Sequence, residues 1–96
     1  MYRVIFTTEF KKNVKAVAKR GYDMSLLSET IDILREKGDL PKKYKKHVLT
    51  GNYKGLFECH IRPDWLLIWK QEDDRLIMQF TNTGSHTDIF DKKRNL

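Results

Sequence analysis

Three histidines and one aspartate are the residues of this chain best suited to acid–base chemistry. His47, His60 and His86 are its only histidines, and each is expected in a loop or on a strand face that is not apolar. Asp64 follows a short turn signal and is expected at a strand end, where side chains tend to be exposed. An imidazole titrates near pH ~6.5, so one histidine can accept a proton while another donates one. We therefore predict that these four side chains converge on one surface site.

The charge of the chain indicates the kind of substrate. Nineteen Lys and Arg residues against thirteen Asp and Glu residues give a formal net charge of +6 with neutral histidines. Such a field favours a polyanionic partner, although a merely soluble basic domain has the same charge. RNA carries its own nucleophile, the ribose 2′-hydroxyl, so histidines need only move protons and stabilise the charged transition state. Cleavage of RNA without a metal or another cofactor is the predicted chemistry.

A basic loop precedes the first of these histidines. Residues 42–47 contain four lysines, Tyr44 and His47, a composition suited to binding phosphates, with the tyrosine available to stack on a base. A solvated lysine loop is the alternative, and the glycine-flanked turn at residues 51–55 favours the functional interpretation. A three-histidine metal site competes for the same residues. The sequence has no close ligand pair such as His-x-x-x-His, so no metal site is predicted.

Hydrophobic periodicity predicts the elements that position these residues. Residues 2–6 alternate as a strand does, and a helix is predicted from the Thr7–Thr8 cap to Gly21. A second helix is predicted from its cap at Asp23 to Gly38. Both helices are amphipathic and a short loop joins them, so we expect an antiparallel helical hairpin.

Three more strands are predicted in the second half of the chain. From Gly55 onward the period changes from helical to alternating, which places Glu58, His60 and Arg62 on one strand face. Residues 66–69 are apolar on both faces, as in a covered central strand, and a third strand alternates over residues 76–80. Residues 82–85 are predicted to break that strand and leave His86 on a loop, before a short closing segment. The predicted fold is α+β in the order β-α-α-β-β-β: a small, mainly antiparallel, twisted sheet with a two-helix hairpin packed on one face.

Size and composition limit the remaining classes. A chain of 96 residues is expected to form a single domain over residues 1–96. The longest apolar run, residues 65–69, is too short to span a bilayer, and the first residues lack the apolar stretch of a signal peptide. One cysteine allows no internal disulfide framework and fits a reducing compartment. A cytoplasmic protein with no membrane partner is expected.

Three separated motifs resemble one known family. Residues 44–51 are similar to its Tyr-Lys-x-His-x-Leu-x-Gly block. Residues 60–68 resemble its His-x-x-Pro-Asp-Trp motif and the apolar strand after it, and residues 83–90 are similar to its Thr-Gly-x-His…Phe ending. These are motifs of the YafQ-type toxins of the RelE/ParE superfamily. The motifs occur in the expected order over nearly the whole chain, so the resemblance is specific.

The resemblance implies the toxin of a type II toxin–antitoxin system. Such a toxin is a ribosome-dependent endoribonuclease that cuts mRNA in the decoding site, without a small-molecule cofactor, and a cognate antitoxin neutralises it. The matching positions imply catalytic roles for His47, His60, Asp64 and His86, with His86 as general acid and the others in base and phosphate-binding roles. Positions predicted to bind RNA or support the site are Lys43, Tyr44, Lys46, Lys54, Arg62, Trp65, Asn82 and Phe90.

One position departs from the family pattern. Members commonly carry an arginine just before the Thr-Gly-x-His motif, where this chain has Asn82. Loss of one transition-state donor costs about a hundred- to a thousandfold in rate. Either a neighbouring cation such as Arg62, Lys46 or Lys54 supplies the charge, or this member is a weaker nuclease.

Two other functions stay open at this point. A ParE-like toxin would act by binding a target protein without catalysis, and it would not need three histidines at matched positions. A basic RNA-binding module would use the same histidines only to contact phosphate. For the basic tail Lys92–Arg94, RNA binding and disorder are both open.

Overall fold

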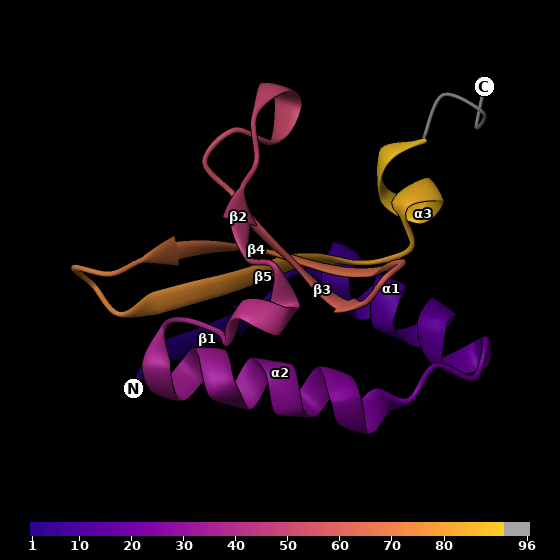
Figure 1. Cartoon of the computed structure of the whole chain (residues 1–96), viewed down its shortest axis with the longest axis horizontal. Coiled ribbons are helices and arrows are strands. Elements are labelled where there is room, and N and C mark those ends of the chain that lie inside the picture. Colours follow the sequence, from indigo (N-terminus) through magenta and orange to yellow (C-terminus); the bar gives the residue numbers. More distant parts are fainter. Residues whose placement is uncertain (92–96) are drawn as a thin grey trace.

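A five-stranded sheet with the order β1-β5-β4-β3-β2 carries the fold in this computed structural model (Figure 1). The strands are β1 (Arg3–Phe6), β2 (His47–Val48), β3 (Phe57–Arg62), β4 (Trp65–Glu72) and β5 (Ile77–Gly84). β1 pairs with β5 in parallel, whereas the other three pairs are antiparallel. The structure describes residues 1–91, so the basic tail, Lys92–Arg94, lies outside the described residues.

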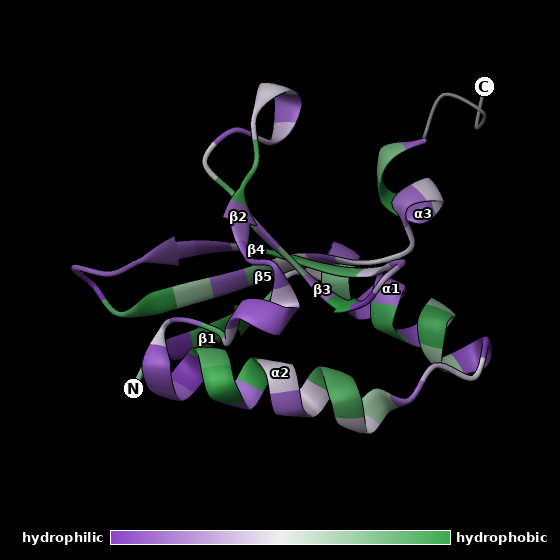
Figure 2. Cartoon of the chain, in the orientation of Figure 1, coloured by the Kyte–Doolittle hydropathy of each residue, from purple (hydrophilic) through white to green (hydrophobic). Residues whose placement is uncertain are grey.

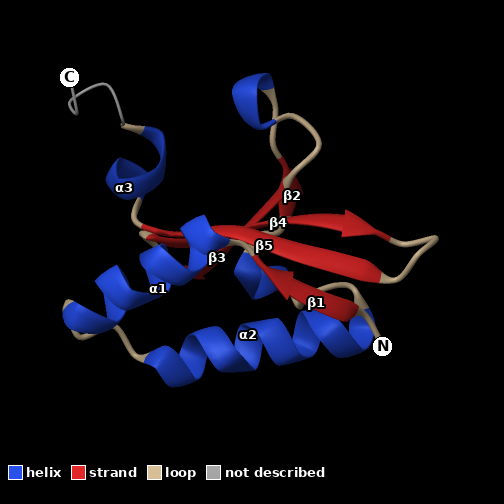
Figure 3. Cartoon of the chain, turned by 180° about the vertical axis from the view of Figure 1, so that it is seen from behind, coloured by secondary structure: helices blue, strands red, loops and turns tan. Residues whose placement is uncertain are grey.

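The two predicted helices, α1 (Thr8–Lys19) and α2 (Met24–Lys37), cover one face of this sheet, and α3 (His86–Phe90) lies on the other face (Figures 1 and 3). Both predicted caps are confirmed. The Thr7 side chain accepts from the backbone nitrogen of Phe10, and Asp23 accepts from Ser25. Gly38 ends α2 in the left-handed conformation that glycine adopts without strain.

Two groups of buried side chains fill the two sides of the sheet. The larger group lies between the sheet and the helix pair, and the smaller group, formed by Leu66, Ile68 and Ile89, lies under α3. β4 contributes to both groups, which confirms the predicted covered central strand. Figure 2 shows apolar residues along the central strands and polar residues at the β4–β5 turn. Within residues 1–91 no helix has the length and apolar character needed to cross a membrane.

β5 continues beyond the predicted break, to Gly84. Thr83 is buried there because its hydroxyl accepts from the Trp65 indole nitrogen at 2.9 Å and donates to the Leu66 carbonyl at 2.7 Å. Its backbone nitrogen donates to the side chain of Asn13 at 3.1 Å, which closes the free edge of β5 beyond the end of β1. Tertiary partners thus keep a polar segment in a strand.

The sequence-based prediction was wrong at three smaller points. Two residues that were expected in a loop form β2, which pairs His47 with Glu58. Leu76 lies in the β4–β5 turn with φ 52° instead of in the strand. His86 begins α3 instead of lying on a loop, because Ser85 caps that helix.

Candidate functional site

The three histidine rings form a row on the face of the sheet that carries α3. The ring centroids of His47 and His60 are 6.3 Å apart, and those of His60 and His86 are 5.9 Å apart. Phe90 extends the row, 6.4 Å from His86. β2, β3 and α3 each contribute one histidine, so the sheet and the short helix bring together residues that are far apart in the sequence.

A carboxylate that the sequence analysis did not include lies between the first two rings. Glu58 Oε1 is 3.0 Å from His47 Nε2 and 3.7 Å from His60 Nε2, and the Glu58 side chain is only 6% exposed. β-sheet register explains its position, because Glu58 pairs with His47 across β2–β3 and shares a strand face with His60. The alternation of β3 was the signal that could have identified Glu58.

Backbone carbonyls orient the same two rings. His47 Nδ1 lies 2.9 Å from the Lys45 carbonyl oxygen, and His60 Nδ1 lies 3.2 Å from that of Pro63. A carbonyl oxygen can only accept, so each Nδ1 carries the proton and each Nε2 faces Glu58. When His47 also donates from Nε2 it is a cation, and the buried carboxylate balances its charge.

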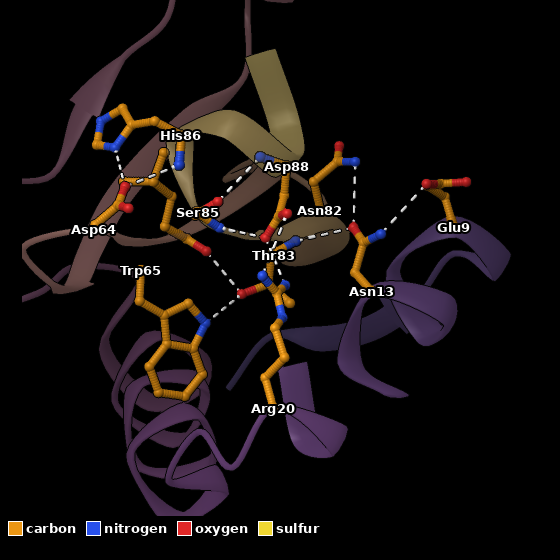
Figure 4. Close-up of polar contacts among 11 residues, drawn as sticks. Glu9, Asn13, Arg20, Asp64, Trp65, Asn82, Thr83, Ser85, His86 and Asp88 are labelled. Atoms are coloured by element: carbon orange, nitrogen blue, oxygen red, sulfur yellow. Dashed lines mark hydrogen bonds and ion pairs between the residues drawn. The ribbon is translucent and has the colours of Figure 1, made fainter. Parts of the chain in front are cut away.

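His86 is held by Asp64 at the other end of the row (Figure 4). Asp64 Oδ1 accepts from the His86 backbone nitrogen at 3.0 Å and from the ring Nδ1 at 2.5 Å. The hydrogen bond from the backbone, followed by that from the ring, lowers the pKa of Asp64 below its ordinary value. Asp64 is therefore an ionised partner that leaves His86 Nε2 directed away from it, available to donate or accept a proton.

Three cations surround a hollow beside His60. The hollow has a volume of about 260 Å³, and its lining includes Lys43, Lys45, His60 and Arg62. Lys43 and Arg62 were predicted at the site and Lys45 was not. Lys45 has φ 53°, a left-handed conformation, and its backbone carbonyl is the one that His47 contacts.

Three of the predicted residues are buried or already have a charged partner. Tyr44 is 6% exposed and packs in the larger buried group, so its predicted role in base stacking is wrong. Trp65 is buried beneath the site, with its ring edge against Tyr22. Lys46 Nζ lies 2.9 Å from Asp39 and over the ring of Phe57, so its charge is already paired.

The remaining predicted residues lie around the row. Asn82 is opposite Ile68, which is itself opposite Glu58, so two strand spacings of about 5 Å separate Asn82 from Glu58. Its amide nitrogen lies 3.4 Å from the Asn13 side-chain oxygen, at the α1 edge (Figure 4). Phe90 is 41% exposed and rests on Tyr53, and Lys54 is exposed after the short turn that contains Tyr53.

The arrangement of the side chains around the histidines also indicates whether they could hold a metal ion. Within the described part of the chain, no group of three or more His, Cys, Asp or Glu side chains is arranged to hold a metal ion. What the arrangement offers is proton transfer, with two carboxylate-supported imidazole sites about 6 Å apart.

A small basic α+β domain with this histidine row has the features of a bacterial toxin of a toxin–antitoxin system. The model of the family described as "Bacterial toxin of type II toxin-antitoxin system, YafQ" matches residues 2–91. The chain therefore belongs to the YafQ toxin family, as the sequence motifs predicted.

Relatives with known names agree with this assignment. The chain is 36% identical over 86 residues to the mRNA interferase toxin YafQ of Escherichia coli K12, covering 88% of this chain and 91% of the relative. It is similar to YafQ in the E. coli DinJ–YafQ complex, with a TM-score of 0.85 and 34% identity over 94% of this chain and 99% of that one. A structure described as a metal-bound toxin from Helicobacter pylori gives a TM-score of 0.85 and 32% identity, covering 94% of this chain and 100% of that one.

Proposed function

We propose that this chain is an mRNA interferase, the toxin of a type II toxin–antitoxin system, and that it cuts translating mRNA on the ribosome by metal-free acid–base chemistry. The observation that carries the proposal is the row of His47, His60 and His86 with its two supporting carboxylates, Glu58 and Asp64. Membership of the YafQ family, whose E. coli relative is named an mRNA interferase, supports the same activity.

His86 is the general acid of the proposed reaction. Asp64 accepts from its Nδ1, so the proton that His86 can give to the leaving 5′-oxygen is on Nε2. The ionised carboxylate also stabilises the imidazolium form of His86, which must be present before the proton is donated.

His60 is the base that removes the proton of the ribose 2′-hydroxyl. Its Nδ1 is held by the Pro63 carbonyl, and the cation formed at its ring lies 3.7 Å from the Glu58 carboxylate. His47 shares the Glu58 carboxylate with His60, so it holds that carboxylate in place beside the base. In-line attack puts the 2′-oxygen and the leaving 5′-oxygen on opposite sides of the phosphorus, so the base and the acid must flank the phosphate. His60 and His86, with ring centroids 5.9 Å apart, can do so.

The cations beside His60 bind the RNA backbone next to the cut. Lys43, Lys45 and Arg62 border one hollow, where they can neutralise a neighbouring phosphate. Their charge lies on the β3 side of the row, whereas Asn82, at the position of the family arginine, lies on β5. The ribosome and its mRNA are the proposed partners, and a cytoplasmic location is part of the same proposal. A cognate antitoxin is a further proposed partner, since E. coli YafQ forms a complex with DinJ.

The test is to map mRNA ends after expressing the wild-type chain or His86→Ala in a translating extract. We expect codon-phased cuts with the wild type and a loss of at least about a hundredfold with the variant. Arg75→Ala, which removes an exposed ion pair at the β4–β5 turn, is the matched control and should cut like the wild type. Growth arrest that persists in His86→Ala without cleavage would contradict the proposal and favour a ParE-like binding toxin.

The same extract tests whether the reaction needs a metal. A similar toxin from H. pylori is described as metal-bound, so the need for a metal has to be tested on this chain itself. We expect the purified toxin to cut at an unchanged rate after chelator treatment, in an extract whose own magnesium is restored. A loss that returns on adding zinc or copper would contradict metal-free chemistry.

A further inference from the structure

α1 holds the segment that carries His86 from the opposite side of the sheet. Figure 4 shows two contacts, one made by Asn13 of α1 and one by Arg20, the residue that caps the C-terminal end of α1. Asn13 accepts from the backbone nitrogen of Thr83 at 3.1 Å, and Arg20 reaches Asp88 of α3. Because α1 and α3 lie on opposite faces, these contacts join the helix layer to the proposed nuclease site around the end of β5.

Asp88 connects the arginine to the start of α3. The Arg20 guanidinium donates to its two carboxylate oxygens, at 2.6 Å from Nη2 and 3.4 Å from Nη1. The same carboxylate accepts from the Ser85 backbone nitrogen at 2.9 Å, and the Ser85 hydroxyl accepts from the Asp88 nitrogen at 3.1 Å. Partial burial alone would raise the pKa of Asp88, but the hydrogen bonds from Arg20 and Ser85 outweigh it and lower the pKa. One ionised carboxylate thus belongs to both an ion pair and a capping box.

The cap controls the position of the next residue, His86. α3 has five residues and one buried side chain, Ile89, and so short a helix is unstable without tertiary contacts. The backbone approaches Asp88 closely here, since a Cβ on Gly84 would lie 2.9 Å from Asp88 Oδ2. The direction in which His86 leaves the sheet therefore depends on where Asp88 is held.

We propose that Arg20 is a positioning residue for His86, which it orients through Asp88 and the Ser85 cap of α3. The inference rests on the proposed function, in which His86 is the general acid. A misplacement of about 1 Å in a reacting group can cost about a hundredfold in rate. Loss of the ion pair should therefore lower kcat by about ten- to a hundredfold and leave KM within about twofold.

A direct contact between Arg20 and RNA is the competing role for an exposed arginine. The Arg20 side chain is 44% exposed, so its charge is accessible to a phosphate. An arginine that only bound RNA would affect KM and the salt dependence of binding when removed, and it would leave the His86 ring unchanged. The two roles thus differ in the kinetic constant and in the spectrum.

The experiment compares Arg20→Ala, Arg20→Lys and Asp88→Asn with the wild type, and uses Arg75→Ala as the control for loss of an exposed ion pair. Ribosome-programmed cleavage gives kcat and KM, circular dichroism checks the fold, and ¹H–¹⁵N spectra report the His86 ring and amide. We expect a lower kcat and shifted His86 resonances for Arg20→Ala and Asp88→Asn, partial rescue by lysine, and no change for Arg75→Ala. Asp88→Asn keeps a side-chain oxygen that can accept from the Ser85 backbone nitrogen, and it removes the negative charge that pairs with Arg20. It therefore tests the ion pair even if Arg20→Ala does not fold.

Two results would overturn the proposal. One is a raised KM with unchanged kcat, which would assign Arg20 to RNA binding. The other is a set of His86 resonances that match the wild type in folded Arg20→Ala and Asp88→Asn. The spectra need no substrate, so they test the link from Arg20 to His86 even if the wild type proves to cut no RNA, in which case only the proposed function fails.

Discussion

At the scale of single residues, Glu58 is the side chain that most changes the interpretation of the site. A carboxylate with 6% side-chain exposure is costly unless it is paired, and Glu58 has two imidazoles beside it. It joins His47 and His60 into one unit, in which a proton gained by either ring meets a negative charge that is already in place. The sequence predicted that the three histidines and Asp64 converge on one site. The structure adds Glu58, which His47 and His60 share, while His86 pairs with Asp64.

The change Glu58→Gln tests this unit. Glutamine keeps the shape of the side chain and removes its charge, so the imidazolium form of His47 and His60 loses its partner. We expect the cleavage rate to fall about tenfold or more, measured by single-turnover cleavage on programmed ribosomes. Folding is followed by circular dichroism, and Glu72→Gln, at the exposed ion pair with Arg75, serves as the matched control. Cleavage at the wild-type rate would mean that Glu58 is only a structural carboxylate.

At the scale of elements, the junction between the end of β5 and the start of α3 depends on contacts with residues that are distant in the sequence. Gly84 joins them with φ +150°, and a Cβ there would lie 2.9 Å from Asp88 Oδ2 and 3.0 Å from Asp88 Cβ. Asp88 cannot move away without losing Arg20 or Ser85. The junction therefore requires glycine for its space as well as for its backbone conformation.

Gly84→Ala should lower the free energy of unfolding by about 1–3 kcal/mol, a typical cost for a strained backbone position. It should also reduce cleavage, because the cap before His86 is displaced. The control is Gly55→Ala, at φ +91° with nothing near the new Cβ, which has a backbone cost without the collision. Denaturant unfolding and cleavage assays on both variants separate the two effects. Equal cleavage by the two variants would argue against a role for the Gly84–Asp88 contact.

The same elements explain how much the sequence could predict. The helix caps at Thr7 and Asp23 and the covered strand β4 were predictable because their signals lie within a few neighbouring residues. The extension of β5 was not, since its polar Thr83 is satisfied by Trp65 and by Asn13 of a distant helix. The site followed the same rule. Strand alternation placed His60 on the correct face, but the burial of Tyr44 depended on packing that no local pattern encodes.

At the scale of the whole molecule, several aspartates connect segments that are distant in the sequence or lie at chain turns. A hydrogen bond from Tyr2 lowers the pKa of Asp73, one from Lys46 lowers that of Asp39, and the His86 backbone lowers that of Asp64. A carboxyl whose pKa is lower in the folded state contributes stability that is complete above its unfolded value, about pH 4, and is lost as the pH falls. These groups should thus act together on acidification.

We expect the free energy of unfolding to decrease steadily as the pH falls from about 4 towards 2, measured by denaturant unfolding at each pH. Asp73→Asn removes the carboxyl partner of Tyr2 and should flatten part of that decrease. Asp74→Asn, at the neighbouring position in the same turn, is the matched control. Stability that rises on acidification in this range would contradict the assigned direction of the shifts.

The parallel pairing of β1 with β5 has a consequence for the order in which the chain folds. β3, β4 and β5 are joined by short turns, and hairpins of this kind close within about 10 μs. β1 must return over a much longer loop, since Thr7 and Thr81 are in contact although they lie 74 positions apart. α1 follows β1 in the chain, packs on β5 and carries Arg20 to Asp88. The contacts that orient His86 are therefore completed in the slow step. A partly folded chain can therefore have β2 to β5 paired and His47 next to His60, while β1 is still absent from the sheet and His86 lacks a defined orientation.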